Sequence, residues 1–293
     1  MTQGVAAPRH PFRLAHDVDW SALDRLDIIH VGQHSTLLVS STTGILIPVT
    51  WADRGLAPGG FALDERDGVR LRAHLVDLQR HRGSLDLGAW RQAAASRGFV
   101  TDLRLPPLPI DAVATRRAAL LLEADPRPSS EPTMDPSTQR ELAPALAAAI
   151  VGGDPSRTGA LARSLIGSGP GATPAGDDVI VGVLAALQLA AAPGLLPTRR
   201  TREARQMLRA VVADGLPRTT AASRHQLGAA LSGSFAERCL HLAGALADPD
   251  AVEPAYVAAR GWGATSGIDF MHGLVSTARA VLGDGTAALP ATA

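Results

Sequence analysis

The most informative stretch of the sequence is Gly167-Ser168-Gly169-Pro170-Gly171-Ala172-Thr173-Pro174-Ala175-Gly176-Asp177-Asp178, which is followed directly by an apolar stretch at residues 179–192. This pattern predicts a tight loop at the start of a buried helix. Glycine adopts positive φ angles and lets backbone N–H groups approach a ligand closely. The start of a helix adds unpaired N–H groups and the positive end of the helix dipole. We therefore expect a loop that binds a small anion.

Two well-known phosphate-binding loops are excluded by residue identity. No Lys-Ser or Lys-Thr pair follows the last glycine, as a Walker A loop requires. The glycine spacing and the prolines also differ from the dinucleotide-binding fingerprint. The anion is thus expected to be held by a different arrangement.

The apolar stretch predicts a core helix and not a membrane span. Gln188, Pro193 and Gly194 interrupt the run from Val179 to Leu196. The clean part is about 14 residues long, short of the roughly 20 that cross a bilayer. The segment from Met1 to Asp19 has no apolar core of a signal peptide. We expect a cytoplasmic protein that does not bind membranes.

Composition narrows the function classes. The chain has 293 residues, enough for one large domain or two ordinary ones. Of these residues 46% are hydrophobic but only 3% are aromatic. This composition favours helices that pack through small side chains. It contains no lysine, which excludes Schiff-base chemistry and attachment of pyridoxal phosphate. A net charge of zero without a basic stripe argues against nucleic-acid binding. The single cysteine, Cys239, excludes an internal disulfide and is expected in the core.

The hydrophobic pattern changes along the chain. Runs at 27–32, 35–40 and 44–50 predict strands, and 67–79 and 88–96 predict helices. After a Pro- and Ser-rich segment, helices are expected at 138–150, 154–166, 177–192, 198–213, 219–246 and 266–282. The prediction is an α+β fold, with a β-rich N-terminal part packed on a mainly α-helical C-terminal part. The expected domains are residues 1–125, a linker or loop at 126–137, and a helical domain at 138–293 that carries the glycine loop.

Three loops in the C-terminal half share one design. In the first, Thr173 is expected to cap a helix that has Pro174 at its first position. The second, residues 217–225, opens a helix at Thr219-Thr220, and in the third, residues 261–269, Ser266 and Asp269 have the spacing of a capping box. We hypothesise that the three helix starts converge on one anion. The candidate binding residues are Gly169, Gly171, Thr173, Gly176, Thr220, Ser223, Arg224, Thr265, Ser266 and Asp269. Ordinary capping is the alternative for each loop alone.

Asp177 and Asp178 are the candidate catalytic residues. One carboxylate would be enough to complement a helix dipole, and two adjacent ones repel each other. A carboxylate pair beside exposed N–H groups suits Mg²⁺ bridged to a phosphate, so Asp177 and Asp178 are also the candidate ligands of Mg²⁺. No other cofactor is indicated. His34 and Ser35 are added as candidates for substrate binding, with a partly buried strand histidine as the alternative reading.

The string from Gly169 to Gly182 closely resembles the signature of the DUF2877 family, the family of the AllH-type subunit of oxamate carbamoyltransferase. The family pattern reads G-x-G-L-T-P-S-G-D-D-x-L-x-G, and here Ala172 replaces Leu and Ala175 replaces Ser. Residues 220–223 and 263–269 are similar to later family blocks, with Ala264 where His is common. Weaker similarity includes His34-Ser35 and extends the resemblance from about residue 27 to 282.

The resemblance implies a role in purine (allantoin) nitrogen metabolism. The enzyme interconverts oxalurate plus phosphate with oxamate plus carbamoyl phosphate, and its AllH-like chain works in a hetero-oligomer with FdrA-like and DUF1116-like subunits. Three readings stay open. The chain is a catalytic transferase subunit, a non-catalytic subunit that binds a metabolite or supports a partner enzyme, or a structural scaffold.

Overall fold

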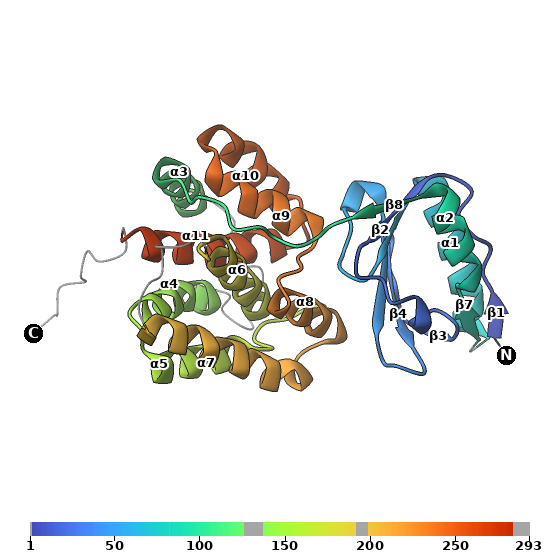
Figure 1. Cartoon of the computed structure of the whole chain (residues 1–293), viewed down its shortest axis with the longest axis horizontal. Coiled ribbons are helices and arrows are strands. Elements are labelled where there is room, and N and C mark those ends of the chain that lie inside the picture. The colour runs from blue at the N-terminus through green and yellow to red at the C-terminus, as the bar shows by residue number, and fades with distance from the viewer. Residues whose placement is uncertain (1, 82, 126–136, 192–198, 284–293) are drawn as a thin grey trace, which may run out of the picture. The chain divides into compact units, whose positions relative to one another are not determined.

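The computed structural model describes residues 2–81, 83–125, 137–191 and 199–283 (Figure 1). The chain forms two compact units. Unit 1 comprises Met1–Arg104 and Phe235–Arg238, and unit 2 comprises Leu105–Ser234 and Cys239–Ala293. Unit 1 holds the strands and unit 2 is helical, so the predicted α+β class is confirmed.

The division between the units falls at residue 104, earlier than the expected boundary at residue 125. The helix α3 (Ala112–Glu123) packs against α10 (Val252–Arg260) and α11 (Ser266–Leu282), so the segment that begins at Leu105 belongs to the helical unit. Of the expected linker at 126–137, all but Ser137 lies outside the described residues.

Within the described residues, unit 1 contains one mixed sheet with the strand order β1-β7-β3-β4-β5-β6-β2-β8. Its centre is the antiparallel meander β3-β4-β5, which confirms the three predicted strands. The strand bounds are Thr2–Gly4 (β1), Phe12–Ala15 (β2), Leu26–Val31 (β3), Ser35–Ser40 (β4), Leu46–Trp51 (β5), Phe61–Leu63 (β6), Ser84–Asp86 (β7) and Gly98–Thr101 (β8).

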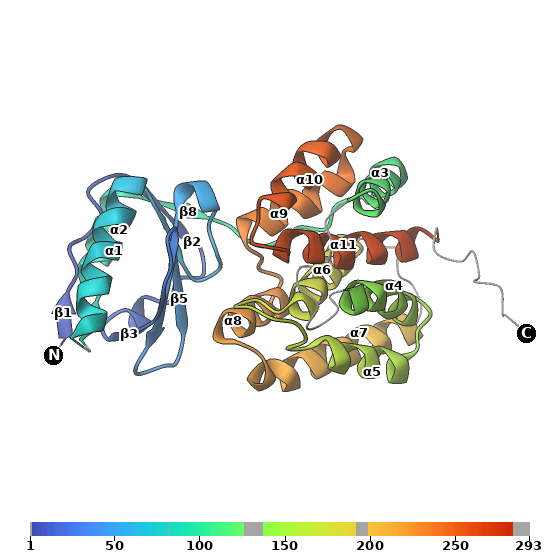
Figure 2. The ribbon, with the colours of Figure 1, turned by 180° about the vertical axis from the view of Figure 1, so that it is seen from behind.

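Two helices, α1 (Glu65–Arg80) and α2 (Gly88–Arg97), cover one face of this sheet (Figures 1 and 2). Asp64 caps α1 by accepting the N–H of Arg66, and Leu71, Leu75 and Leu78 form its buried stripe at helical spacing. Phe12 and Phe61 of the sheet pack against each other and against Trp90 of α2, with ring centroids 5.2–6.2 Å apart. Both helices were predicted from the sequence.

A short segment from the C-terminal half completes unit 1. Glu237 accepts hydrogen bonds from the Arg13 guanidinium at 2.5 Å and from the backbone N–H of Leu56 at 3.0 Å. The side chain of Glu237 thus ties residues 235–238 to two separate segments of unit 1.

Because residues 235–238 belong to unit 1, the long helix predicted at 219–246 is interrupted. The structure has α8 (Ala221–Leu231) and α9 (Glu237–Gly244) in its place. Between them the chain turns at Gly233, whose φ of 84° is left-handed and ends helical geometry. The prediction of one continuous helix is therefore wrong. The alanine-rich sequence on both sides favours a helix and gave no sign of this turn.

Unit 2 is organised around α6 (Ala175–Leu189), which contacts α4, α5, α8 and α11 (Figures 1 and 2). Every residue of α6 except Gln188 is buried, as predicted for a core helix. No helix within the described residues is both long enough and apolar enough to cross a membrane. Cys239 is buried in α9, as expected. The other helices are α4 (Ser137–Val151), α5 (Pro155–Leu165) and α7 (Arg199–Gly215).

Candidate functional site

The glycine loop joins α5 to α6 and has the backbone that its composition predicted. Gly167, Gly169 and Gly171 have φ angles of 72°, 112° and 97°, a region that glycine enters without strain. The tip of the loop, residues 170–172, is exposed. Among the described residues, the N–H groups of Gly169, Gly171 and Ala172 have no hydrogen-bond acceptor. Three backbone donors are therefore available at the loop.

The other two predicted loops hold the glycine loop in place. From the second loop, the Thr220 hydroxyl donates to the carbonyl oxygen of Ala172 at 2.5 Å. From the third loop, the Ser266 hydroxyl is hydrogen-bonded to the Thr173 hydroxyl at 2.9 Å. The three loops thus meet in one place. We call residues 167–178, 217–224 and 262–269 together the three-loop cluster.

Two of the predicted helix caps differ in the structure. Thr173 does not cap α6, because the helix begins at Ala175 with Pro174 at the N-cap position and the Thr173 hydroxyl bonds to Ser266. Ser266 and Asp269 do not form a capping box either, since Thr265 occupies the N-cap of α11 without a side-chain bond. The hydroxyl groups of Thr173 and Ser266 bond to each other between the loops and do not cap their own helices. Only the predicted cap of α8 is confirmed: Thr220 accepts the N–H of Ser223 at 3.2 Å.

Asp177 ties the glycine loop to the second loop. Its Oδ1 accepts the N–H of Gly167 at 2.8 Å, and its Oδ2 accepts the hydroxyl of Thr219. Burial raises the pKa of Asp177, and the hydrogen bonds from Thr219 and Gly167 oppose that rise. Both carboxylate oxygens are engaged by the protein, so Asp177 fixes the geometry of the cluster.

Asp178 differs from its neighbour because one of its oxygens has no protein partner. The residue is 2% exposed, and Oδ2 makes no hydrogen bond within the described part of the chain. Burial raises the pKa of Asp178 well above 3.8; nearby Asp269 and Asp177 add to the rise, whereas Ser266 and Thr173 oppose it. A carboxyl group that keeps its proton to higher pH can donate a hydrogen bond.

Asp269 forms a buried ion pair with a helix that the sequence did not link to it. Its Oδ1 accepts Nε–H of Arg140 from α4 at 2.8 Å, and Asp269 is fully buried. Burial raises the pKa of Asp269 despite the opposing effect of Arg140. One turn further along α11, burial and the charge of Arg140 lower the pKa of His272 to about 4. The imidazole of His272 is therefore neutral at physiological pH.

The carboxylates of Asp177 and Asp178 do not fit a shared magnesium ion. Asp177 is bonded to Gly167 and Thr219, whereas Asp178 interacts with Ser266 and Thr173 on the other side of the cluster. In the described ranges, no group of three or more His, Cys, Asp or Glu side chains is arranged to hold a metal ion. A magnesium ion between the pair would have to displace the hydrogen bonds of Asp177, so we derive no step through a metal.

The remaining candidates divide into three groups. Ser223 and Thr265 lie in the cluster. The Ser223 hydroxyl is buried with no hydrogen-bond partner among the described residues, and Thr265 helps to lower the pKa of Asp269. Arg224 is exposed at its edge, with Nε donating to the carbonyl oxygen of Leu216. Packing requires glycine at position 176, because a Cβ there would lie 2.1 Å from the carbonyl oxygen of Leu165.

His34 and Ser35 are not part of the three-loop cluster. They belong to unit 1, at the turn between β3 and β4, where the ring of His34 contacts Trp51 edge to face at 4.6 Å. His34 is partly buried, as the alternative reading expected, but it lies in the turn before β4 and not in a strand.

Sequence reasoning missed two site residues: Thr219 in the cluster, and Arg140 of α4, which binds Asp269 of the cluster. Thr219 was noted only as part of a helix start, and its bond to Asp177 depends on the fold bringing residues 42 positions apart together. Arg140 had no local signal at all, since it is one arginine on an amphipathic helix that lies 129 residues from Asp269.

Residues 165–278 match the family model described as oxamate carbamoyltransferase subunit AllH. The resemblance to this family is thus confirmed over a segment that contains the whole three-loop cluster. Its extension to residues 27–164 stays a prediction. No curated protein and no solved structure gives a significant match to the chain.

Proposed function

We propose that this chain is a subunit of a carbamoyltransferase and that its three-loop cluster binds a small anionic metabolite of the carbamoyl phosphate or oxamate type. The observation that carries the proposal is the junction of the three loops. Thr220 and Ser266 hold the glycine loop so that N–H groups of Gly169, Gly171 and Ala172 have no acceptor among the described residues. The family match over the same residues supports the assignment.

The chemistry of the cluster suits a small oxyanion. Backbone N–H groups at a helix start bind phosphate and carboxylate oxygens through directed hydrogen bonds. Transfer of a carbamoyl group needs donors that stabilise charge on a carbonyl oxygen and on the departing phosphate. Arg218 and Arg224 are exposed, and the backbone carbonyl of Arg218 lies close to Gly167, where it would be 2.8 Å from a Cβ. The Arg218 guanidinium donates to the carbonyl oxygen of Arg163, and Nε of Arg224 donates to that of Leu216. These guanidinium groups supply the positive charge that the binding of an anion requires.

Asp178 gives the site a proton near the loop. Its raised pKa means that the carboxyl group stays protonated to higher pH than an exposed aspartate, and its Oδ2 has no partner in the described part of the chain. In this proposal the protonated group donates a hydrogen bond within the cluster, and Asp177 is a positioning residue that keeps the loops together. The pathway, allantoin nitrogen metabolism, follows from the family resemblance alone.

Binding is tested by isothermal titration calorimetry with carbamoyl phosphate, oxamate and inorganic phosphate. We expect Arg224→Gln to weaken binding of carbamoyl phosphate by about tenfold, the effect of losing one charge-assisted contact. Arg202→Gln is the matched control, because Arg202 is exposed on α7 outside the cluster. Equal affinity in both variants, or no binding by the wild-type chain, would contradict the proposal.

The alternative is a non-catalytic subunit that binds the metabolite or completes the site of a partner. The exposed position of the loop tip, residues 170–172, favours this second candidate, because another subunit could cover the tip. The purified chain would then bind carbamoyl phosphate but show no transfer to oxamate. Transfer would appear only after FdrA-like and DUF1116-like subunits are added. Turnover by the chain alone would exclude the alternative.

A further inference from the structure

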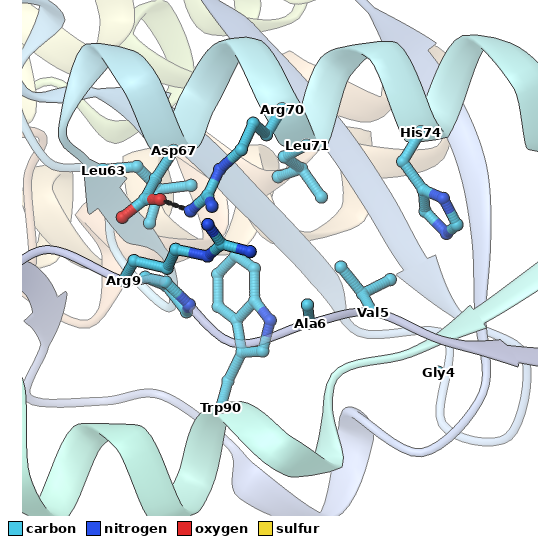
Figure 3. Close-up of a pocket in the computed structure, with 11 residues that line it drawn as sticks. Gly4, Val5, Ala6, Arg9, Leu63, Asp67, Arg70, Leu71, His74 and Trp90 are labelled. Atoms are coloured by element: carbon cyan, nitrogen blue, oxygen red, sulfur yellow. Dashed lines mark hydrogen bonds and ion pairs between the residues drawn. The ribbon is translucent and has the colours of Figure 1, made fainter.

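Unit 1 contains a cavity that the proposed function does not use. The cavity has a volume of about 320 Å³ and lies between α1, Trp90 of α2 and the N-terminal segment that follows β1 (Figure 3). Its size is at the lower end of the range of small-molecule sites, roughly 300–1,000 Å³. Leu63, Leu71 and Val5 give it apolar walls.

The mouth of the cavity is positively charged. Arg9 and Arg70 both line it, together with one carboxylate, that of Asp67. Asp67 is 4% exposed, and it binds Arg70 on one oxygen and the N–H of His10 at 2.9 Å on the other. The Arg9 guanidinium makes no ion pair or hydrogen bond with any other described residue. Two guanidinium groups and one carboxylate leave a single positive charge, and Arg9 carries it.

Two residues that line the cavity, Trp90 and His74, carry buried polar atoms without partners in the part of the chain that the structure describes. Nε1 of Trp90 and Nε2 of His74 are buried and make no hydrogen bond within the described ranges. Trp90 is 1% exposed and is held by edge-on contacts with Phe61 at 5.2 Å and Phe12 at 6.2 Å between ring centroids. Because these rings fix the indole, its N–H group has a fixed position. An indole N–H only donates, so an occupant that reaches it must bring an acceptor.

We propose that this cavity binds a small monocarboxylate that carries a second hydrogen-bond acceptor. The carboxylate meets Arg9 and Arg70 at the mouth, where the fork of a guanidinium group matches two carboxylate oxygens. The second acceptor takes the N–H of Trp90, and the short apolar part lies against Leu71. Asp67 is a positioning residue, since it holds Arg70 and the backbone of His10 at the rim. This site lies in unit 1 and is separate from the three-loop cluster.

The test uses ¹⁵N–¹H spectra of the full chain, in which the four tryptophans give four indole signals. Pyruvate is the probe, because it has a carboxylate and a keto oxygen, and propionate is its match without the keto group. We expect pyruvate to shift the Trp90 indole signal in a saturable way and propionate to bind more weakly. Trp90→Phe assigns the signal. If that variant does not fold, Trp20→Phe, Trp51→Phe and Trp262→Phe assign it by elimination.

Arg9→Gln should weaken pyruvate binding by about tenfold through the loss of a charge-assisted contact. Arg72→Gln is the matched control, because Arg72 is exposed on α1 and does not line the cavity. The absence of a saturable shift, or equal affinities of the two variants, would overturn the site. Tighter binding of inorganic phosphate than of pyruvate would overturn the carboxylate assignment, and equal binding of propionate would overturn the role of Trp90.

Discussion

Gly182 of α6 lies directly against the backbone carbonyl of Phe270 in α11. A Cβ at Gly182 would be 2.1 Å from that oxygen, far closer than any real contact allows. The reverse contact exists one turn away, where a Cβ at Gly273 of α11 would be 2.0 Å from the carbonyl oxygen of Val179. The two helices therefore touch backbone to backbone. This contact fixes the first turn of α6, with Asp177 and Asp178, against the first turn of α11, with Asp269.

Replacing Gly182 with alanine should destabilise unit 2. The added methyl group forces the two helices apart, and such overpacking costs roughly 1–3 kcal/mol of unfolding free energy. Gly228→Ala is the matched control, because Gly228 is also inside a helix but a Cβ there meets nothing within 4 Å. That control should be neutral or stabilising by up to about 1 kcal/mol. Urea denaturation followed by circular dichroism measures both, and equal effects would refute the backbone contact.

The helices and the glycine loop could be predicted because their signals are local. The apolar run after Asp178 predicts a buried helix, and glycine density predicts positive φ angles such as the 97° of Gly171. The hydrogen-bond partners could not be predicted in the same way. Thr173 and Ser266 each read as a helix cap, yet they bond to each other across 93 residues. A cap is a local alternative that tertiary packing can override.

Two short strands of unit 1, β1 and β7, were missed for a similar reason. β1 and β7 have three residues each, too few to show an alternating pattern, and they are strands because they pair with each other in parallel. Long-range pairing of this kind leaves no periodicity in the sequence. The position of Glu237 in unit 1 could not be predicted either, because it depends on a hydrogen bond from Arg13, which is distant in the sequence.

The stability of the protein should respond to pH through Asp178. Its pKa is raised in the folded state from 3.8, so the folded protein holds this proton more tightly than the unfolded chain. The contribution of Asp178 to stability is therefore greatest below pH 3.8 and declines as the pH rises above it. Asp178→Asn keeps a neutral side chain at every pH. We expect its unfolding free energy, relative to wild type, to improve as the pH rises above about 4 in urea denaturation.

The control for Asp178 is Asp214→Asn, which makes the same change at an exposed position on α7. The difference between this variant and wild type should show no comparable improvement over the same pH range. A parallel pH response of both aspartate variants would show that Asp178 is not the source of the effect.

The contribution of His272 to stability should depend on pH in the opposite direction to that of Asp178. Burial, followed by the charge of Arg140, lowers its pKa from 6.5 to about 4 in the folded state. The unfolded chain binds the proton first as the pH falls, so the contribution of His272 to stability is present above pH 6.5 and is lost towards pH 4. An NMR titration should find the folded imidazole neutral down to about pH 4. A midpoint near 6.5 in the folded protein would contradict the buried environment.

The ion pair between Arg140 and Asp269 should couple α4 to α11. Arg140→Met leaves the buried Asp269 carboxylate without its partner, so it is expected to cost about 3–5 kcal/mol of unfolding free energy. Asp269→Asn leaves the partly exposed Arg140 and should cost less. The double variant should cost less than the sum of the two, with a coupling energy of roughly 1–3 kcal/mol. Denaturation of the four proteins in a double-mutant cycle measures this. The matched control is the exposed pair Arg199–Glu203, whose side chains are 87% and 44% exposed and whose coupling should be no more than about 0.5 kcal/mol. Equal coupling in the two cycles would mean that Arg140 does not hold the first turn of α11 in place.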